Sequence, residues 1–123
     1  MAKRILIADD SESIRMVIRN FLENHEGFEV CGEAANGVDA IEKAKELRPD
    51  LIILDLAMPR MNGAAAASIL KSTMPDVPVI LFSMYDDFMS KLLSSAVPVD
   101  LVLSKPDGLN DMVAHVRYLL GPE

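Results

Sequence analysis

The sequence is poor in cysteine and in aromatic residues. It has one cysteine, no tryptophan, two tyrosines and four phenylalanines among 123 residues. The single cysteine, Cys31, cannot form a disulfide within the chain, which excludes the disulfide frameworks typical of small secreted domains. We predict that Cys31 packs as a small buried side chain without a redox role.

Long hydrophobic runs and an excess of positive charge are also absent. No apolar stretch approaches the roughly 20 residues that a membrane span requires, and residues 1–4 lead into a strand-like segment instead of a signal peptide. Lysine and arginine total 12 against 19 aspartates and glutamates, for a formal net charge of −7. Without a membrane span or signal peptide, we expect a cytoplasmic protein that does not contact a membrane. Binding to a phosphate backbone depends on clustered cations, so we also expect no direct contact with nucleic acid.

The residues that are abundant suit one hydrophobic core. Half of the chain is hydrophobic and a quarter is charged, as in an ordinary globular domain. No repeat, low-complexity tract or linker divides the sequence. We predict one domain over residues 1–123.

Short apolar runs alternate with segments of helical periodicity along the chain. The clearest runs, LIIL and VILF, are continuously apolar, which is typical of strands buried on both faces. Strand and helix alternate five times and so predict parallel strands, since each crossover must return over a face of the sheet. The predicted strands cover residues 4–8, 28–34, 50–55, 77–83 and 100–104.

Five helices are predicted after these strands, which gives a three-layer α/β/α sandwich when the crossovers are right-handed. The first helix can be capped by Ser11 or Ser13 and presents five apolar residues at helical spacing. That apolar stripe consists of Ile14, Val17, Ile18, Phe21 and Leu22. Three further helices span about residues 37–47, 63–73 and 86–96. The last helix has Asp107 or Asn110 near its start and carries an apolar stripe from Leu109 to Leu120.

Polar residues stand at the carboxyl ends of four predicted strands. Asp9 and Asp10 follow the first strand, and Asp55 closes the third. Ser83 closes the fourth strand, and Lys105 follows the fifth. Ligands of such folds bind at this edge of the sheet. Three carboxylates there repel one another unless a cation neutralises them, so these oxygen ligands predict a Mg²⁺ site.

Phosphoryl transfer to Asp55 is the chemistry that these side chains support. A lysine, a hydroxyl group and Mg²⁺ around one carboxylate would stabilise the equatorial oxygens of a phosphoryl group that passes to it. Asp55 is then a nucleophile at a rigid strand end, and the turn over residues 58–63 keeps it accessible.

Four segments, ILIADD, LIILDLAMPRMNG, VILFS and LSKP, stand in an order and spacing that match a known family. On these motifs the chain resembles the receiver domain of bacterial two-component response regulators over essentially its whole length. The resemblance implies a flavodoxin-like sheet of strand order 2-1-3-4-5. It also implies a phosphoprotein of signal transduction whose only chemistry is its own phosphorylation and dephosphorylation. A stand-alone, chemotaxis-regulator-like protein and a receiver excised from a DNA-binding regulator both fit the sequence.

The resemblance assigns roles to the acidic residues. Asp55 is implied to be the phosphoacceptor, which receives its phosphoryl group from the phosphohistidine of a sensor histidine kinase or phosphotransfer protein. Asp9, Asp10 and Asp55 are implied to bind Mg²⁺ together with the backbone carbonyl of Ala57.

Ser83 and Lys105 resemble the switch hydroxyl and the lysine of the family's site. Phosphorylation is implied to change the face formed by the fourth helix, fifth strand and fifth helix, where an unknown effector binds or a homodimer forms on activation. The chain departs from the family pattern at Val102, where many receivers carry an aromatic switch residue. We therefore expect coupling through repacking of Val102 and Phe88 or Met89, or through Tyr85, without an aromatic rotamer change at position 102.

Two other functions share this architecture and stay open as alternatives. A haloacid-dehalogenase-type phosphohydrolase also uses an aspartyl nucleophile, but its motif is Asp-x-Asp, whereas Asp9 and Asp10 are adjacent. A flavodoxin-like carrier needs hydroxyls and amides in its phosphate-binding loop, where the two aspartates would repel a phosphate.

Overall fold

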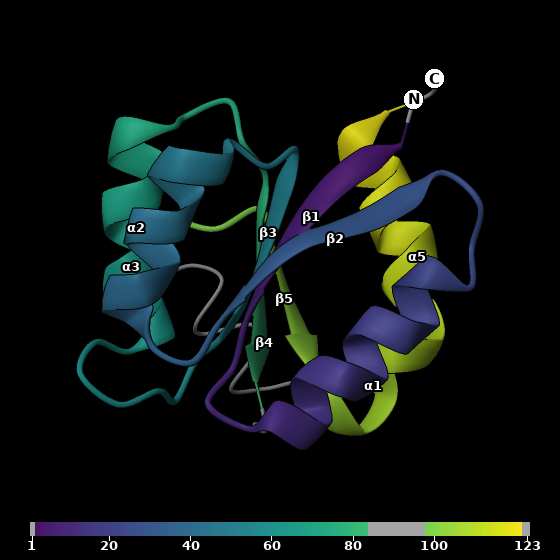
Figure 1. Ribbon diagram of the computed structural model, residues 1–123, viewed down its shortest axis with the longest axis horizontal. Coiled ribbons are helices and arrows are strands. Elements are labelled where there is room, and N and C mark those ends of the chain that lie inside the picture. Colours follow the sequence, from purple (N-terminus) through teal and green to yellow (C-terminus); the bar gives the residue numbers. More distant parts are fainter. Residues whose placement is uncertain (1, 84–97, 122–123) are drawn as a thin grey trace.

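Five parallel strands form one sheet, and helices cover both of its faces (Figure 1). The computed structural model describes residues 2–83 and 98–121, with the backbone alone described at residue 83 and residues 104–111. The strands are β1 (Lys3–Ala8), β2 (Phe28–Ala34), β3 (Leu51–Asp55), β4 (Val79–Ser83) and β5 (Leu101–Ser104). They lie in the order β2-β1-β3-β4-β5, so the predicted parallel sheet and its strand order are confirmed.

Within the described ranges, helices lie on both faces of the sheet. Figure 1 shows α2 and α3 side by side on one face and α1 and α5 on the other. The helices are α1 (Glu12–Glu23), α2 (Gly37–Leu47), α3 (Gly63–Thr73) and α5 (Lys105–Leu120). The three-layer, flavodoxin-like sandwich is therefore confirmed. The helix predicted at residues 86–96 lies outside the described residues and stays a prediction.

The bounds of α2 and α3 agree with the sequence prediction because local signals fix them. Asn36 and Asn62 cap the two helices, and each side-chain oxygen accepts a 2.8 Å hydrogen bond from the N–H three residues ahead. Helix α2 ends at Leu47, since Arg48 takes a left-handed φ of 49° and Pro49 cannot continue the helix.

Strand β4 begins at Val79, two residues later than predicted. The N–H of Val77 donates to the Met74 carbonyl at 3.1 Å in a turn, and Pro78 has no N–H for a strand ladder. At Val79 the chain joins the sheet, and the N–H of this residue donates to the Asp100 carboxylate at 2.7 Å.

Two helices also differ in detail from the prediction. Helix α5 begins at Lys105, ahead of Asp107 and Asn110, the residues predicted near its start, because Pro106 is tolerated in a first turn whose N–H groups have no partner within the helix. In α1, Ser11 is the cap, as one of the two predicted alternatives. Its stripe buries Ile18 fully, but Val17 is 47% exposed, so the prediction that it faces the core is wrong.

The core consists of two layers, one on each side of the sheet. Neighbouring residues of the central strands point to opposite faces, so each strand supplies both layers. Towards α1 and α5 the layer includes Ile5, Ile7 and Ile53, and towards α2 and α3 it includes Leu6, Ile52 and Leu54. These six side chains are at most 1% exposed. The central strands are consequently a rigid support for whatever lies at their ends.

Cys31 of β2 packs against the layer beneath α2 but is only partly buried, whereas the sequence prediction was a buried side chain. Burial raises the pKa of its thiol, which lowers the fraction of reactive thiolate. None of the described helices combines the length and the apolar character needed to cross a bilayer.

We predict that Ile53→Ala destabilises the protein by about 2–5 kcal/mol, because it leaves a cavity at the centre of a fully buried strand. The matched control is Ile69→Ala on α3, where the side chain is 37% exposed and truncation should change stability by no more than about 0.5 kcal/mol. Urea unfolding measures both. Equal losses in the two variants would contradict the assignment of the core.

Candidate functional site

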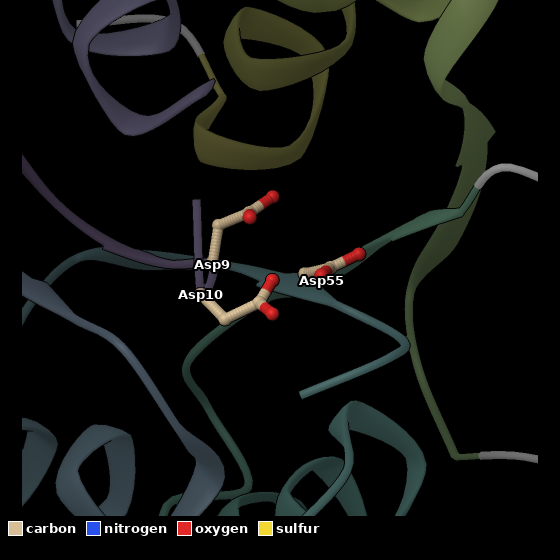
Figure 2. Close-up of side chains that lie close together, drawn as sticks. All are labelled: Asp9, Asp10 and Asp55. Atoms are coloured by element: carbon tan, nitrogen blue, oxygen red, sulfur yellow. The ribbon is translucent and has the colours of Figure 1, made fainter. Parts of the chain in front are cut away.

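Three aspartates meet at the carboxyl edge of the sheet. Asp9 and Asp10 follow β1, and Asp55 is the last residue of the neighbouring strand β3. One carboxylate oxygen from each lies within 4.8 Å of the others, and Figure 2 shows the three side chains gathered at this edge. The cluster predicted from the sequence is therefore present.

The three carboxylates differ in exposure. Asp9 and Asp55 are 2% and 5% exposed, whereas Asp10 is open to solvent. Two unit charges about 5 Å apart repel by roughly 3 kcal/mol at an effective dielectric constant of about 20, so this grouping is unfavourable by itself. A small divalent cation reached from the Asp10 side would offset the repulsion, and three carboxylate oxygens are suitable donors for it.

The connection from β1 to α1 fixes Asp9 from several directions. Its N–H donates to the Ala34 carbonyl at 3.0 Å, which extends the pairing with β2 by one residue. Its carboxylate accepts a 2.9 Å hydrogen bond from the N–H of Ser11. The Ser11 hydroxyl in turn accepts from the N–H of Ile14 and caps α1. Asp9 is thus held by both a strand and a helix start.

The turn after Asp55 folds back tightly against the end of β3. Pairing with β4 continues one residue past the strand, since the Leu56 N–H donates to the Phe82 carbonyl at 3.1 Å. The N–H of Gly63 then donates to the Leu56 carbonyl at 2.8 Å. A Cβ atom at Gly63 would collide with the Asp55 carbonyl oxygen. Glycine is required at this position because the start of α3 packs directly on the backbone of Asp55.

Three further predicted residues lie at the same edge, as far as the backbone places them. Ser83 ends β4 and pairs with Ser104 of β5, and Lys105 follows at the start of α5. The side chains of Ser83 and Lys105 lie outside the described residues. Ala57 lies two residues past Asp55 in an exposed bend of the turn. The roles of all three stay predictions.

Val102 lies within β5, in register with Leu81, and is partly buried against the layer beneath α2 and α3. A branched aliphatic side chain therefore occupies the position at which the chain departs from the aromatic residue of many receivers. Its packing within a filled layer leaves few rotamers for a large movement.

Arg15 of α1 belongs to the surroundings of the site but carried no signal in the sequence. Its guanidinium donates to the Asp9 carbonyl at 2.6 Å and to the Glu33 carboxylate at 2.9 Å. Glu33 lies 18 residues further along the chain in β2, so only the folded sheet brings the two together.

Comparison with known proteins identifies the family of this chain. The family model described as "Response regulator receiver domain" matches residues 5–117. The chain belongs to the response regulator receiver family.

Individual relatives agree with this membership. The chain is 38% identical over 119 residues to the response regulator protein VraR of Staphylococcus epidermidis, a match that covers 95% of this chain and 56% of the relative. It is 42% identical over 83 residues to the chemotaxis protein CheY of Thermotoga maritima, covering 68% of each. The chain thus spans about half the length of the VraR relative.

Solved structures agree with the fold. The response regulator domain of Thermotoga maritima CheB superposes with a TM-score of 0.88 at 25% identity, and the match covers 100% of this chain and 99% of that one. This similarity supports the receiver fold for the described residues.

We predict that Gly63→Ala lowers stability by about 1–3 kcal/mol and displaces the end of β3, because the added methyl group meets backbone atoms that cannot move away alone. Gly32→Ala is the control, since its Cβ would meet the ends of two leucine side chains, Leu47 at 2.6 Å and Leu6 at 3.4 Å, and no backbone atom. Denaturant unfolding and the amide chemical shifts of Asp55 and Leu56 report the two effects. A smaller loss for Gly63→Ala than for Gly32→Ala would contradict the close packing described above.

Proposed function

We propose that residues 1–123 form one receiver domain that accepts a phosphoryl group on Asp55 in a Mg²⁺-dependent reaction. The observation that supports this most directly is the meeting of Asp9, Asp10 and Asp55 at the carboxyl edge of the sheet. The donor is the phosphohistidine of a sensor histidine kinase or phosphotransfer protein, as membership in the receiver family suggests.

Asp55 acts as the nucleophile. A carboxylate oxygen of Asp55 attacks the phosphorus atom, a P–O bond forms, and the P–N bond to the donor imidazole breaks and leaves its electron pair on the nitrogen. The product is an aspartyl phosphate and a free histidine. The rigid strand end and the packing of Gly63 on the Asp55 backbone keep the nucleophile in one orientation.

Asp9, Asp10 and Asp55 would hold the magnesium ion, with the carbonyl of Ala57 as a further ligand. When bound, Mg²⁺ neutralises the carboxylates and the developing charge on the phosphoryl oxygens. Buried Asp9 is fixed by its backbone and carboxylate contacts, whereas exposed Asp10 faces the side from which a hydrated ion arrives.

Ser83 and Lys105 complete the proposed site. The hydroxyl group would donate a hydrogen bond to one phosphoryl oxygen, and the ammonium group would pair with another. Ser83 lies at the end of β4 and Lys105 directly after β5, at the same edge of the sheet as Asp55.

The domain is a regulatory switch without turnover of an external substrate. Adjacent Asp9 and Asp10 do not fit the Asp-x-Asp motif of the aspartyl phosphohydrolases, and two anions after β1 do not suit the phosphate loop of a flavodoxin-like carrier. A phosphoryl group on Asp55 would accept a hydrogen bond from the Ser83 hydroxyl. This contact would change the face formed by the predicted fourth helix, β5 and α5. That face binds an effector or a second copy of the chain in the cytoplasm.

We predict that acetyl phosphate with Mg²⁺ adds one phosphoryl group per chain and that Asp55→Asn abolishes this labelling. The control is Asp76→Asn, which removes the same charge from an exposed residue before β4, away from the acidic cluster. Intact-protein mass spectrometry measures the labelling, with EDTA as the metal-free comparison. Labelling of Asp55→Asn at the wild-type rate would refute the assignment.

We also predict that beryllofluoride with Mg²⁺ changes the chemical shifts of amides from the Asp55 loop as far as residues 86–104. The physical reason is that a phosphoryl-like group draws Ser83 inward and alters the packing around Val102. Heteronuclear NMR of the free and bound protein measures the extent. Changes confined to the loops around Asp55 would contradict this route to the output face.

A further inference from the structure

Arg15 connects the acidic cluster to the neighbouring strand β2. Its Nη1 donates to the Asp9 carbonyl at 2.6 Å, and its Nε donates to Oε1 of Glu33 at 2.9 Å. The Arg15 side chain is only 16% exposed. A planar guanidinium with two partners in different directions has one orientation, so both of these contacts are made at once.

The carbonyl that Arg15 contacts belongs to the peptide group between Asp9 and Asp10. The ψ angle of Asp9 and the φ angle of Asp10, on either side of this planar group, set the direction of the Asp10 side chain relative to that of Asp9. The Asp9 N–H, bonded to Ala34, fixes the preceding peptide, and the Ser11 N–H fixes the Asp9 carboxylate. Arg15 supplies the contact that fixes the peptide between the two acidic residues.

Glu33 is itself anchored, which makes it a firm support for Arg15. Arg19 lies 3.0 Å from the second carboxylate oxygen of Glu33, and Lys43 of α2 donates to its backbone carbonyl. The Cα of Glu33 is in register with Ile7 in the β1–β2 pairing. The Arg15 guanidinium is therefore held between β2 and the residue that follows β1.

We infer that Arg15 is a positioning residue for magnesium binding, which orients the Asp9–Asp10 peptide so that both carboxylates face the ion. This inference rests on the proposed Mg²⁺ site and deepens it. Partners that orient metal ligands commonly change metal affinity by about 10- to 100-fold when removed.

Electrostatics alone makes the opposite prediction. Arg15 is a cation beside a cluster of three carboxylates, so removing its charge should strengthen the binding of a divalent cation. A positioning role requires weaker binding instead. The sign of the change separates the two explanations.

The experiment compares Arg15→Met with Arg19→Met by calorimetric titration with MgCl₂ alone, without a phosphodonor. Each variant loses one positive charge and one ion pair with Glu33, but only Arg15 contacts the Asp9 carbonyl. We expect the magnesium dissociation constant of Arg15→Met to rise by about tenfold, and that of Arg19→Met to stay near the wild-type value. The ¹⁵N shift of Asp10 should move in metal-free Arg15→Met and not in Arg19→Met.

Unchanged or tighter magnesium binding by folded Arg15→Met would overturn the inference, and so would equal weakening in both variants. If Arg15→Met does not fold, Arg15→Lys takes its place, because lysine keeps the charge but cannot hold both partners; it should also bind magnesium more weakly. Wild-type protein that binds no magnesium would overturn the proposed function itself. Wild-type binding with an unaffected Arg15 variant would overturn only the role of Arg15.

Discussion

The repulsion among Asp9, Asp10 and Asp55 is the constraint on which the structure around the site depends. Carboxylates this close together tend to move apart, above all when two of the three are buried, and any loop flexible enough to allow that would disperse the cluster. The fold prevents it by placing each aspartate at the end of a central strand whose apolar residues are almost completely buried. The three carboxylates are thereby kept together despite their mutual repulsion.

Short-range packing then refines what the strands provide. At Asp55, the absence of a Cβ on Gly63 lets the start of α3 lie directly on the strand end. At Asp9, hydrogen bonds from Ser11 and Arg15 fix the carboxylate and the carbonyl separately. The two sides of the site are thus held by different means, close backbone packing on one and a polar network on the other.

Signals that lie close together in the sequence predicted the structure well. Helices α2 and α3 have the predicted bounds because an asparagine cap at one end and, for α2, a proline at the other act within a few residues. Prediction was weaker where a neighbour in space decides. Val17 sits at the margin of the α1 stripe and stays exposed, and β4 begins only where Val79 meets Asp100 from the next strand connection.

The sequence by itself determined the parallel sandwich, the family and the three aspartates of the site, because buried strands are apolar runs and each aspartate stands at a strand end. Only the tertiary structure decided which carboxylates are buried and what holds them. The pairing of Arg15 with Glu33, and of Arg15 with the Asp9 carbonyl, leaves no trace in periodicity or spacing. Such contacts join α1 to β2 and to the residue that follows β1, and their geometry exists only after the sheet has assembled.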